Sequence, residues 1–530
     1  MATLHTESTI FGQLVRRLTG GKVFLHAEER DPNLLQSASS AWAVQGNNLE
    51  SAHERQRLDG SGHQSSPTSR NHSAPNFGDG SRALIVDWYS RDDPENPQNW
   101  SNALKHSLMF QICLLNFAVY IASSIYVPGE PDLMEEFGVS SVVATLGLSL
   151  FTIGYGTGPM LWSPLSEMPQ LGRTGIFFYT LLAFIVFQLP VGFAPNITCF
   201  LVFRFVTGSS YLVLWSSAGV MGPVFGPVIG GFLAPAMGWR WTIWVFTFLC
   251  IFVLGLMFFF LPETSGPKIL HDRARRLRKA TGNPNFMTKA ELEAGHSTRS
   301  HWGDIMRLLA RAFTLTFTEP IIFLVDLYAG LLYGVLFIWF ESFPLVFGEI
   351  YHFTPQQQGL VFLGILVFTA ISVPALLWWL KTRLVPRATA EDKSSRFKPE
   401  AVLPPAFIGS VILPACLFWF GWSSRPDIHW IAPVIGSGTF AVGIVTLFNS
   451  VYNYIGIIYA QYAASVFAGA ALFRAGMGAA FPLFARALFE KLGVGPGNSL
   501  LGGIAVLFVP VPFIFHQYGE RIRRWSKHAD

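Results

Sequence analysis

Four charged residues stand inside long apolar runs of the sequence. They are Arg204, Asp326, Glu341 and Arg474. A charge within a membrane helix is costly unless it is paired or faces water, so each of these residues is a candidate functional group. A carboxyl group in such a setting could bind and release a proton. An arginine there could hold a carboxylate, helix carbonyls or a ligand.

The two carboxyl groups belong to one predicted helix. Asp326, Gly330, Tyr333, Phe337 and Glu341 recur at i, i+4, i+7, i+11 and i+15, so they share a face that could border a central cavity. Asp326 is expected about two helical turns inside the membrane, where reversible protonation would suit coupling to a proton gradient. A hydrated, interfacial position for Asp326 and a loop-facing position for Glu341 are the alternatives.

Polar and aromatic residues on other apolar runs could build a substrate surface, because aromatic and cation–π contacts tolerate varied cationic ligands. Arg474 could instead act as a structural clamp. For the others, hydrogen bonding between helices is the alternative role. The candidate cavity residues are Gln111, Asn116, Tyr120, Ser123, Tyr333, Asn449 and Arg474.

A glycine- and proline-rich segment over residues 218–232 gives a specific packing signal. Gly222, Gly226 and Gly230 recur every four residues, so they line one helix face and let another helix approach closely. Prolines on the same segment remove backbone donors and bend it. The motif residues are Gly222, Pro223, Gly226, Pro227, Gly230 and Gly231.

Composition shows what kind of scaffold must position these residues. Hydrophobic residues make up 51% of the chain and charged residues 13%, against ~25% charged in an average soluble domain. The net charge of +4 gives no electrostatic footprint for nucleic acid. Stretches with the ~20 apolar residues that a membrane helix needs are 106–127, 140–161, 174–194, 241–261, 320–343, 357–380, 402–422, 429–451, 462–485 and 498–516.

Loop charges predict the topology. Basic clusters in 262–317, in 381–399 and in the tail place these segments in the cytoplasm, and the acidic loop 128–139 faces outside. The predicted organisation is a disordered leader over 1–103, an N-terminal transmembrane half over 104–261, a basic linker over 262–317, a C-terminal half over 318–516 and a cytoplasmic tail over 517–530.

The motifs resemble those of the major facilitator superfamily, specifically its fungal twelve-span drug:proton antiporters. Residues 226–231 match the family's antiporter motif, GPxxGG, and residues 158–173 look like its cytoplasmic gating motif. The gate residues implied are Gly158, Pro164, Glu167, Gly172 and Arg173, with Glu167 and Arg173 expected to pair. Residues 93–101, 261–264 and 474–484 match as well, so the resemblance covers about 85–530.

The resemblance implies an all-α bundle of two six-helix halves and proton-coupled export of small cationic or amphipathic molecules, such as drugs, polyamines or secondary metabolites. Arg204 stands where the family carries a basic residue linked to proton transfer. The expected setting is the plasma membrane, with a monomeric chain, no cofactor, and substrate and protons as partners. The sequence contains neither a P-loop nor a catalytic motif, so we do not expect an enzyme. Nutrient uptake and facilitated diffusion stay open as alternatives.

One departure from the family concerns the fourth span. Roughly 30 residues are missing between Arg204 and Trp215 relative to the family, and the stretch 196–238 barely holds two spans of ~20 residues. We therefore expect a fourth helix that is shortened or missing. A degenerate, non-transporting membrane protein is accordingly a further alternative.

Overall fold

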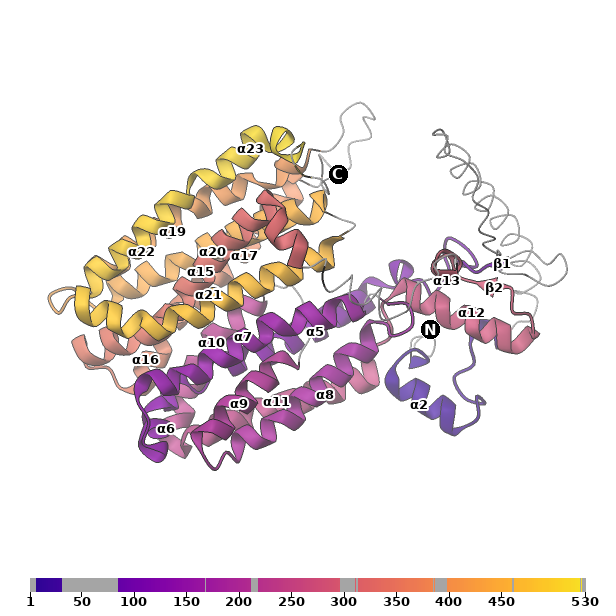
Figure 1. Ribbon diagram of the computed structural model, residues 1–530, viewed down its shortest axis with the longest axis horizontal. Coiled ribbons are helices and arrows are strands. Elements are labelled where there is room, and N and C mark those ends of the chain that lie inside the picture. The colour runs from indigo at the N-terminus through magenta and orange to yellow at the C-terminus, as the bar shows by residue number, and fades with distance from the viewer. Residues whose placement is uncertain are drawn as a thin grey trace, which may run out of the picture. The chain divides into compact units, whose positions relative to one another are not determined.

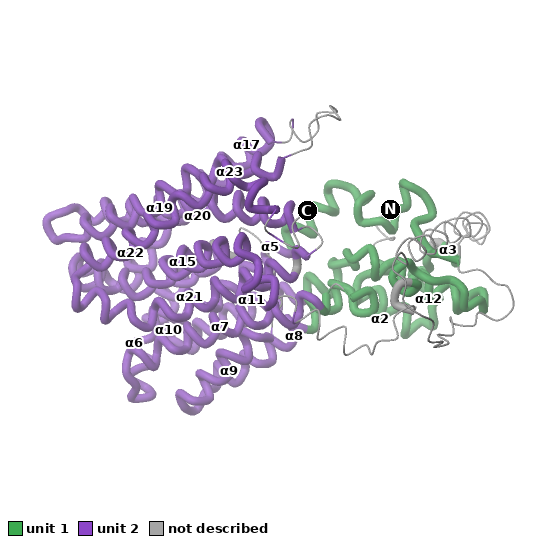
Figure 2. The backbone as a smooth tube through the Cα atoms, turned by 45° about the horizontal axis from the view of Figure 1, so that its top comes forward, with its two compact units in different colours: residues 1–111, 165–179, 255–306 green, residues 112–164, 180–254, 307–530 purple. Residues whose placement is uncertain are grey.

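The computed structural model forms two compact units, each containing several segments of the chain. The linker unit comprises Met1–Gln111, Leu165–Tyr179 and Gly255–Met306, and the bundle unit comprises Ile112–Pro164, Thr180–Leu254 and Arg307–Asp530 (Figure 2). The structure describes residues 6–30, 84–166, 168–210, 218–295, 310, 313–384, 386, 398–459, 462–524 and 526.

Long apolar helices account for most of the bundle unit. Within the described residues, 10 helices are long and apolar enough to cross a membrane, and they coincide with the ten runs predicted from the sequence. In the N-terminal half the elements are α5 (Asn102–Ser124), η2 (Val127–Gly129), α6 (Glu130–Phe137), α7 (Ser141–Ser166), α8 (Arg173–Gly192), α9 (Ile197–Ser209), α10 (Ala218–Met237) and α11 (Trp239–Phe260).

The C-terminal half follows after the linker. Its long helices run side by side, with α15 against α21 and α19 against both α20 and α22 (Figure 1). The elements are α15 (Pro320–Phe343), η3 (Pro344–Ile350), α16 (Pro355–Val361), α17 (Leu363–Trp379), η4 (Leu380–Leu384), η5 (Pro399–Val402), α19 (Pro404–Ser423), α20 (Ile431–Ile458), α21 (Ala463–Leu492), α22 (Val494–Phe508) and α23 (Pro510–Arg523).

Helices α15 and α11 show the two extremes of burial. Nearly every side chain of α15 is buried, as expected of a helix that is hydrophobic all round. Gly334 lets α21 come close, because an added Cβ atom would lie 2.8 Å from Phe481 Cγ. By contrast, α11 exposes Phe248, Phe252 and Phe260. A lipid environment accommodates such a surface, whereas water would not.

The fourth helix is the shortest of the apolar helices in the N-terminal half. Helix α9 has 13 residues, or ~20 Å at 1.5 Å per residue, against a hydrocarbon core of ~30 Å. Residues 211–217 lie outside the described residues, and α10 begins directly after them. The predicted loss of part of the fourth span therefore stays a prediction.

The linker unit has a small hydrophobic core of its own. Its elements are α2 (Ile10–Leu18), α3 (Ala27–Arg30), β1 (Leu84–Ile85), η1 (Pro97–Asn99), α12 (Gly266–Thr281), β2 (Phe286–Met287) and α13 (Lys289–Gly295). Strands β1 and β2 pair in parallel, with Leu84 opposite Phe286. Val86 packs with Ala274, Leu277 and Phe286 beneath them.

The predicted disorder over 1–103 was therefore too broad. Residues 84–101 include β1 and η1 and contact α12 through Val86, Asp93 and Glu95, and α2 is formed near the N-terminus. Composition alone could not show this, because the apolar partner of this segment lies far along the chain. Residues 31–83 lie outside the described residues.

A buried arginine joins the two chain segments of the linker unit. Arg273 on α12 has an exposed fraction of 0%, and its guanidinium contacts Asp93 at 2.9 Å and Glu95 at 2.6 Å. Its Cζ also lies 4.1 Å from the centroid of the Tyr89 ring. Burial opposes ionisation of Glu95, but contacts with His26 and Arg273 outweigh it and hold the pKa of this carboxyl well below its usual range.

Candidate functional site

The bundle unit buries one carboxyl group without a hydrogen-bond donor. Asp326, in the second turn of α15, has an exposed fraction of 0%, and neither of its oxygens accepts a hydrogen bond from the described residues. The structure thus places it in the core of the bundle unit. An ionised carboxylate left unpaired in an apolar core is strongly unfavourable, so Asp326 is suited to carry a proton or to meet a cation.

Arg474 lies in the same core, over two tyrosine rings. Its Cζ is 5.8 Å from the Tyr333 centroid and 5.5 Å from the Tyr452 centroid. Its Nε donates to the carbonyl of Ala470 at 3.3 Å, and its charge acts on Asp326. Arg474 therefore combines a helix-carbonyl contact with an aromatic setting, and so shows features of both predicted roles.

Contacting tyrosine rings connect this polar core to helices of both halves of the bundle. The Tyr120 ring on α5 lies 5.4 Å from that of Tyr155 on α7, and Tyr155 lies 6.5 Å from Tyr333 on α15. The structure thus brings together three predicted cavity residues: Tyr120, Tyr333 and Arg474. Tyr155 was missed from the sequence. The only sequence feature that could have indicated a cavity position for Tyr155 is its polar hydroxyl group on a span without charged residues.

The remaining predicted cavity residues are satisfied locally or lie elsewhere. The hydroxyl of Ser123 donates to the carbonyl of Tyr120 at 2.8 Å. The side-chain amide of Asn449 donates to the carbonyl of Val445 at 2.8 Å. Both bonds lie within one helix. Gln111 belongs to the linker unit, where its amide lies 3.5 Å from Ser107 Oγ. Asn116 is fully buried on α5. Their place in a substrate cavity stays a prediction.

Arg204 is held by backbone carbonyls. Its guanidinium donates to the carbonyls of Gly147 at 3.1 Å, Ala122 at 2.9 Å and Ser123 at 3.2 Å. The Phe151 ring centroid lies 4.4 Å from its Cζ. These contacts join α9 to α5 and α7, so the geometry describes an interhelical clamp. The predicted part of Arg204 in proton transfer stays a prediction.

The glycines of the antiporter motif face α5 at very short range. A Cβ atom on Gly222 would lie 2.5 Å from Tyr120 Cβ, and one on Gly226 would lie 2.0 Å from Ser124 Oγ. Further along, a Cβ atom on Gly230 would lie 2.0 Å from the carbonyl oxygen of Ile125. The predicted close approach of a second helix is therefore present, and α5 is that helix.

A second side of the same motif contacts the other half of the bundle. A Cβ atom on Gly231 would lie 2.8 Å from the carbonyl oxygen of Pro355, and one on Gly359 would lie 2.5 Å from that of Pro227. Pro223 accepts a hydrogen bond from Ser124 Oγ at 2.6 Å, which uses a carbonyl of the proline-bent segment. The motif is thus packed between α5 and α16.

The gating motif is described only in part. Glu167 lies outside the described residues, so its predicted pairing with Arg173 is not visible. Gly158 and Pro164 lie within α7, and Gly172 has a left-handed φ of +74°. At the start of α8, the backbone N–H groups of Arg173 and Thr174 donate to the Glu263 carboxylate at 3.1 and 3.3 Å.

Glu263 is therefore a site residue that sequence reasoning missed. It belongs to the Leu-Pro-Glu-Thr segment after α11, and it also accepts hydrogen bonds from the backbone N–H groups of Thr264 and Ser265. A carboxylate at the beginning of a helix is favourable for the free N–H groups there. Glu263 was visible in the Leu-Pro-Glu-Thr motif, but the start of α8 that it contacts lies about 90 residues earlier in the chain.

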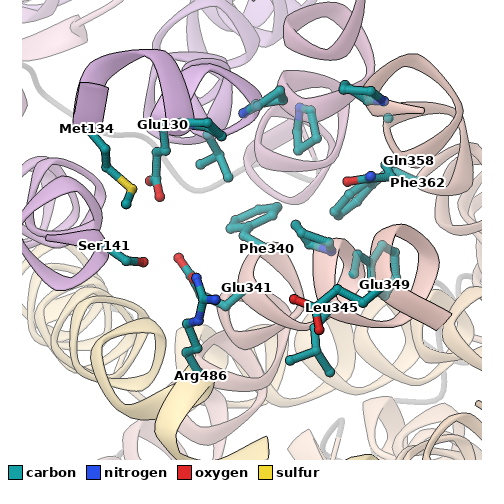
Figure 3. Close-up of a pocket in the computed structure, with 18 residues that line it drawn as sticks. Glu130, Met134, Ser141, Phe340, Glu341, Leu345, Glu349, Gln358, Phe362 and Arg486 are labelled. Carbon is teal, nitrogen blue, oxygen red and sulfur yellow. The ribbon is translucent and has the colours of Figure 1, made fainter. Parts of the chain in front are cut away.

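Glu341 lines a cavity of about 310 Å³ in the bundle unit (Figure 3). Thr145 Oγ1 lies 3.1 Å from one of its carboxylate oxygens. The other predicted carboxyl, Asp326, does not line this cavity. Asp326 and Glu341 of α15 therefore lie in separate parts of the bundle unit.

A family model described as Major Facilitator Superfamily matches residues 112–218 and 209–482. The chain belongs to the Major Facilitator Superfamily. The two matched segments overlap at 209–218, which contains the junction where the fourth span was predicted to be shortened. The family prediction made from the motifs is confirmed, and the protein is a multi-pass membrane protein.

Members of this superfamily from three yeasts resemble the chain over most of its length. The transporter mfs1 of Schizosaccharomyces pombe is 38% identical, covering 84% of this chain and 88% of its own. The cycloheximide resistance protein of Candida maltosa is 36% identical, covering 99% of both. Fluconazole resistance protein 1 of Saccharomyces cerevisiae is 36% identical, covering 84% of this chain and 85% of its own.

Proposed function

We propose that this protein is a secondary active transporter that exports small cationic or amphipathic molecules in exchange for protons. Its relatives' names refer to resistance against cycloheximide and fluconazole, which supports export of foreign compounds. The observation that carries the coupling is Asp326, a fully buried carboxyl without a hydrogen-bond partner among the described residues. We place the protein in the plasma membrane as a monomer.

One carboxyl group with two competing cations is sufficient for exchange. When the core opens to the cytoplasm, water reaches Asp326 and the carboxylate can ionise. A cationic substrate can then neutralise it inside the tyrosine-lined core formed by Tyr120, Tyr155 and Tyr333. When the core opens outward, a proton replaces the substrate. The neutral form tolerates burial, so the empty carrier can return.

The antiporter motif supports this cycle by sealing one side of the path. Helix α10 packs on α5 through Gly226 and on α16 through Gly231, and neither glycine contributes a side chain to the contact. Such contacts have two discrete packed arrangements more readily than a continuous range. The motif would therefore keep the outward path closed until the two halves of the bundle move.

The proposal can be tested by efflux from yeast cells that lack their own multidrug exporters. Cells expressing the protein are loaded with rhodamine 6G, a lipophilic cationic dye, and efflux is followed with and without a protonophore. We expect efflux that stops with the protonophore and is lost in Asp326→Asn. The matched control is Asp132→Asn, which alters an exposed acid of α6. Efflux that survives the protonophore would contradict proton coupling, and dye uptake would contradict export.

A non-transporting protein is the second candidate, because α9 has only 13 residues. Sequencing the transcript across Arg204–Trp215 tests it. An additional polar segment there would remove the reason for this candidate. If the junction stands as printed and the protein at the cell surface moves no dye, the non-transporting function is favoured.

A further inference from the structure

The cavity that Glu341 lines has a chemical character distinct from the Asp326 core. Among the described residues, its lining includes the carboxyl groups of Glu130, Glu341 and Glu349 and one basic side chain, Arg486. Its aromatic wall consists of Phe340, Phe343 and Phe362. The lining comes from both halves of the bundle. The acidic loop that holds Glu130 is predicted to face outside the cell.

Two of these carboxylates compete for one hydroxyl proton. Thr145 Oγ1 lies 3.4 Å from Glu130 Oε2 and 3.1 Å from Glu341 Oε1. The same oxygen lies 3.0 Å from the carbonyl of Ser141. A threonine hydroxyl has a single proton to donate, so it satisfies one of these three acceptors at a time. Thr145 alone therefore cannot satisfy both carboxylates at once.

Glu130 also interacts with the Tyr126 hydroxyl, but that hydroxyl donates its single proton to the carbonyl of Ala144 at 3.1 Å. The Glu130 side chain is buried, with an exposed fraction of 7%, and its Oε1 accepts no hydrogen bond from the part of the chain that the structure describes. Figure 3 shows Glu130 and Glu341 pointing toward the same part of the cavity. A buried anion with an unused oxygen needs a cation or a proton to balance it.

The neighbouring basic groups are already engaged. Arg486 pairs with Glu490 at 2.8 Å, and its charge also acts on Glu341 and Glu349. Arg204, whose charge acts on Glu130, donates to three backbone carbonyls. Glu349 adds a further negative charge to the cavity lining. The described lining therefore has more acidic than basic side chains.

We propose that this cavity is a second binding site for the exported molecule, in which Glu130 and Glu341 hold the ammonium group of an amphipathic organic cation. An ammonium nitrogen carries the donors that both carboxylates lack. The phenylalanine wall receives the apolar part, and cation–π contact adds to the attraction. A volume of about 310 Å³ suits a small molecule. The inference rests on the proposed function, and it adds an exit site to it.

The test is equilibrium binding to the full-length protein in lipid nanodiscs, which requires no transport. The probe is dansylcadaverine, an amphipathic primary ammonium whose fluorescence rises in an apolar pocket, and its neutral N-acetyl derivative is the matched ligand. We expect the ammonium form to bind at least about ten-fold more tightly than the derivative, and Glu130→Gln to remove about that factor. The matched control Glu135→Gln, an exposed acid on the same helix α6, should bind as the wild type does.

Two further variants separate the possible results. Glu341→Gln should weaken binding as Glu130→Gln does, which covers the case in which one variant does not fold. The proposal is overturned if both variants fold and bind normally, or if Asp326→Asn alone removes binding. Reconstituted vesicles provide the separate test of function. Ammonium-selective binding that depends on Glu130, without gradient-driven movement of the probe, would contradict export but leave the site in place.

Discussion

Buried ionisable side chains have different surroundings in the two units of this protein. In the linker unit, Arg273 is fully buried but is paired with Asp93 and Glu95. In the bundle unit, Asp326 is as deeply buried but has no hydrogen-bond partner among the described residues. The paired arrangement fixes two chain segments together. The carboxyl group of Asp326 joins no two segments by hydrogen bonds among the described residues, so its burial calls for a functional explanation.

The difference has an energetic consequence. Removing one partner of a buried ion pair leaves an uncompensated charge, so such changes are strongly destabilising. Replacing an unpaired buried acid by a neutral side chain of the same shape removes a liability instead. Substitutions at the buried ion pairs of the linker unit should therefore reduce stability, whereas substitution of Asp326 in the bundle unit should reduce function alone. The following changes test this contrast in order of their expected effect on stability.

The largest loss of stability is expected for Arg273→Met. The change leaves the buried Asp93 and the half-buried Glu95 beside an apolar side chain, and we expect a loss of about 3–5 kcal/mol. Thermal unfolding of the purified protein measures this loss. The control is Arg275→Met, which alters an exposed arginine of the same helix and should leave the melting temperature unchanged. Equal behaviour of the two variants would show that the ion pairs do not hold the linker unit.

A smaller loss is expected for Gly226→Ala in the antiporter motif. The added methyl group would meet Ser124 Oγ at 2.0 Å, so α5 and α10 must separate. We expect destabilisation of about 1–3 kcal/mol from overpacking. The matched change Gly255→Ala places a methyl group in open space on α11, where alanine is the better helix former. A neutral Gly226→Ala would contradict the close contact.

Acid should weaken the linker unit by a still smaller amount. Burial opposes ionisation of Glu291, but His271 and Arg278 outweigh it and lower its pKa to about 2, below the ~4.3 of an unfolded glutamate. Its stabilisation is therefore present above the unfolded pKa and is lost as the pH falls toward the folded value. Melting temperatures of wild type and Glu291→Gln should converge from pH 6 to pH 3. A constant difference would contradict this.

No loss of stability is expected for Asp326→Asn. The amide has nearly the same shape and carries no charge, so the melting temperature should stay the same or rise. The same variant should have lost proton-driven efflux. A marked fall in melting temperature would mean that Asp326 has a structural partner, and the contrast between the two units would then fail.

The sequence predicts features that depend on local pattern, and misses those that depend on distant partners. The apolar runs predicted the spans, and the spacing of Gly222, Gly226 and Gly230 predicted a close helix contact. The order of residues 84–101 was missed, because Arg273 lies about 180 residues from the acids it binds. Glu130 was counted only as an acid of an outer loop. Its burial follows from tertiary packing that no local pattern records.

The most direct test of the account is proton movement in vesicles that contain the purified protein and a trapped pH-sensitive dye. Rhodamine 6G is supplied on one side, and proton flow in the opposite direction is recorded for wild type and for Asp326→Asn. We predict proton counterflow in the wild type that is absent in the variant, although the variant is equally stable. Equal proton counterflow in both proteins would contradict the assignment of Asp326 as the exchanging group.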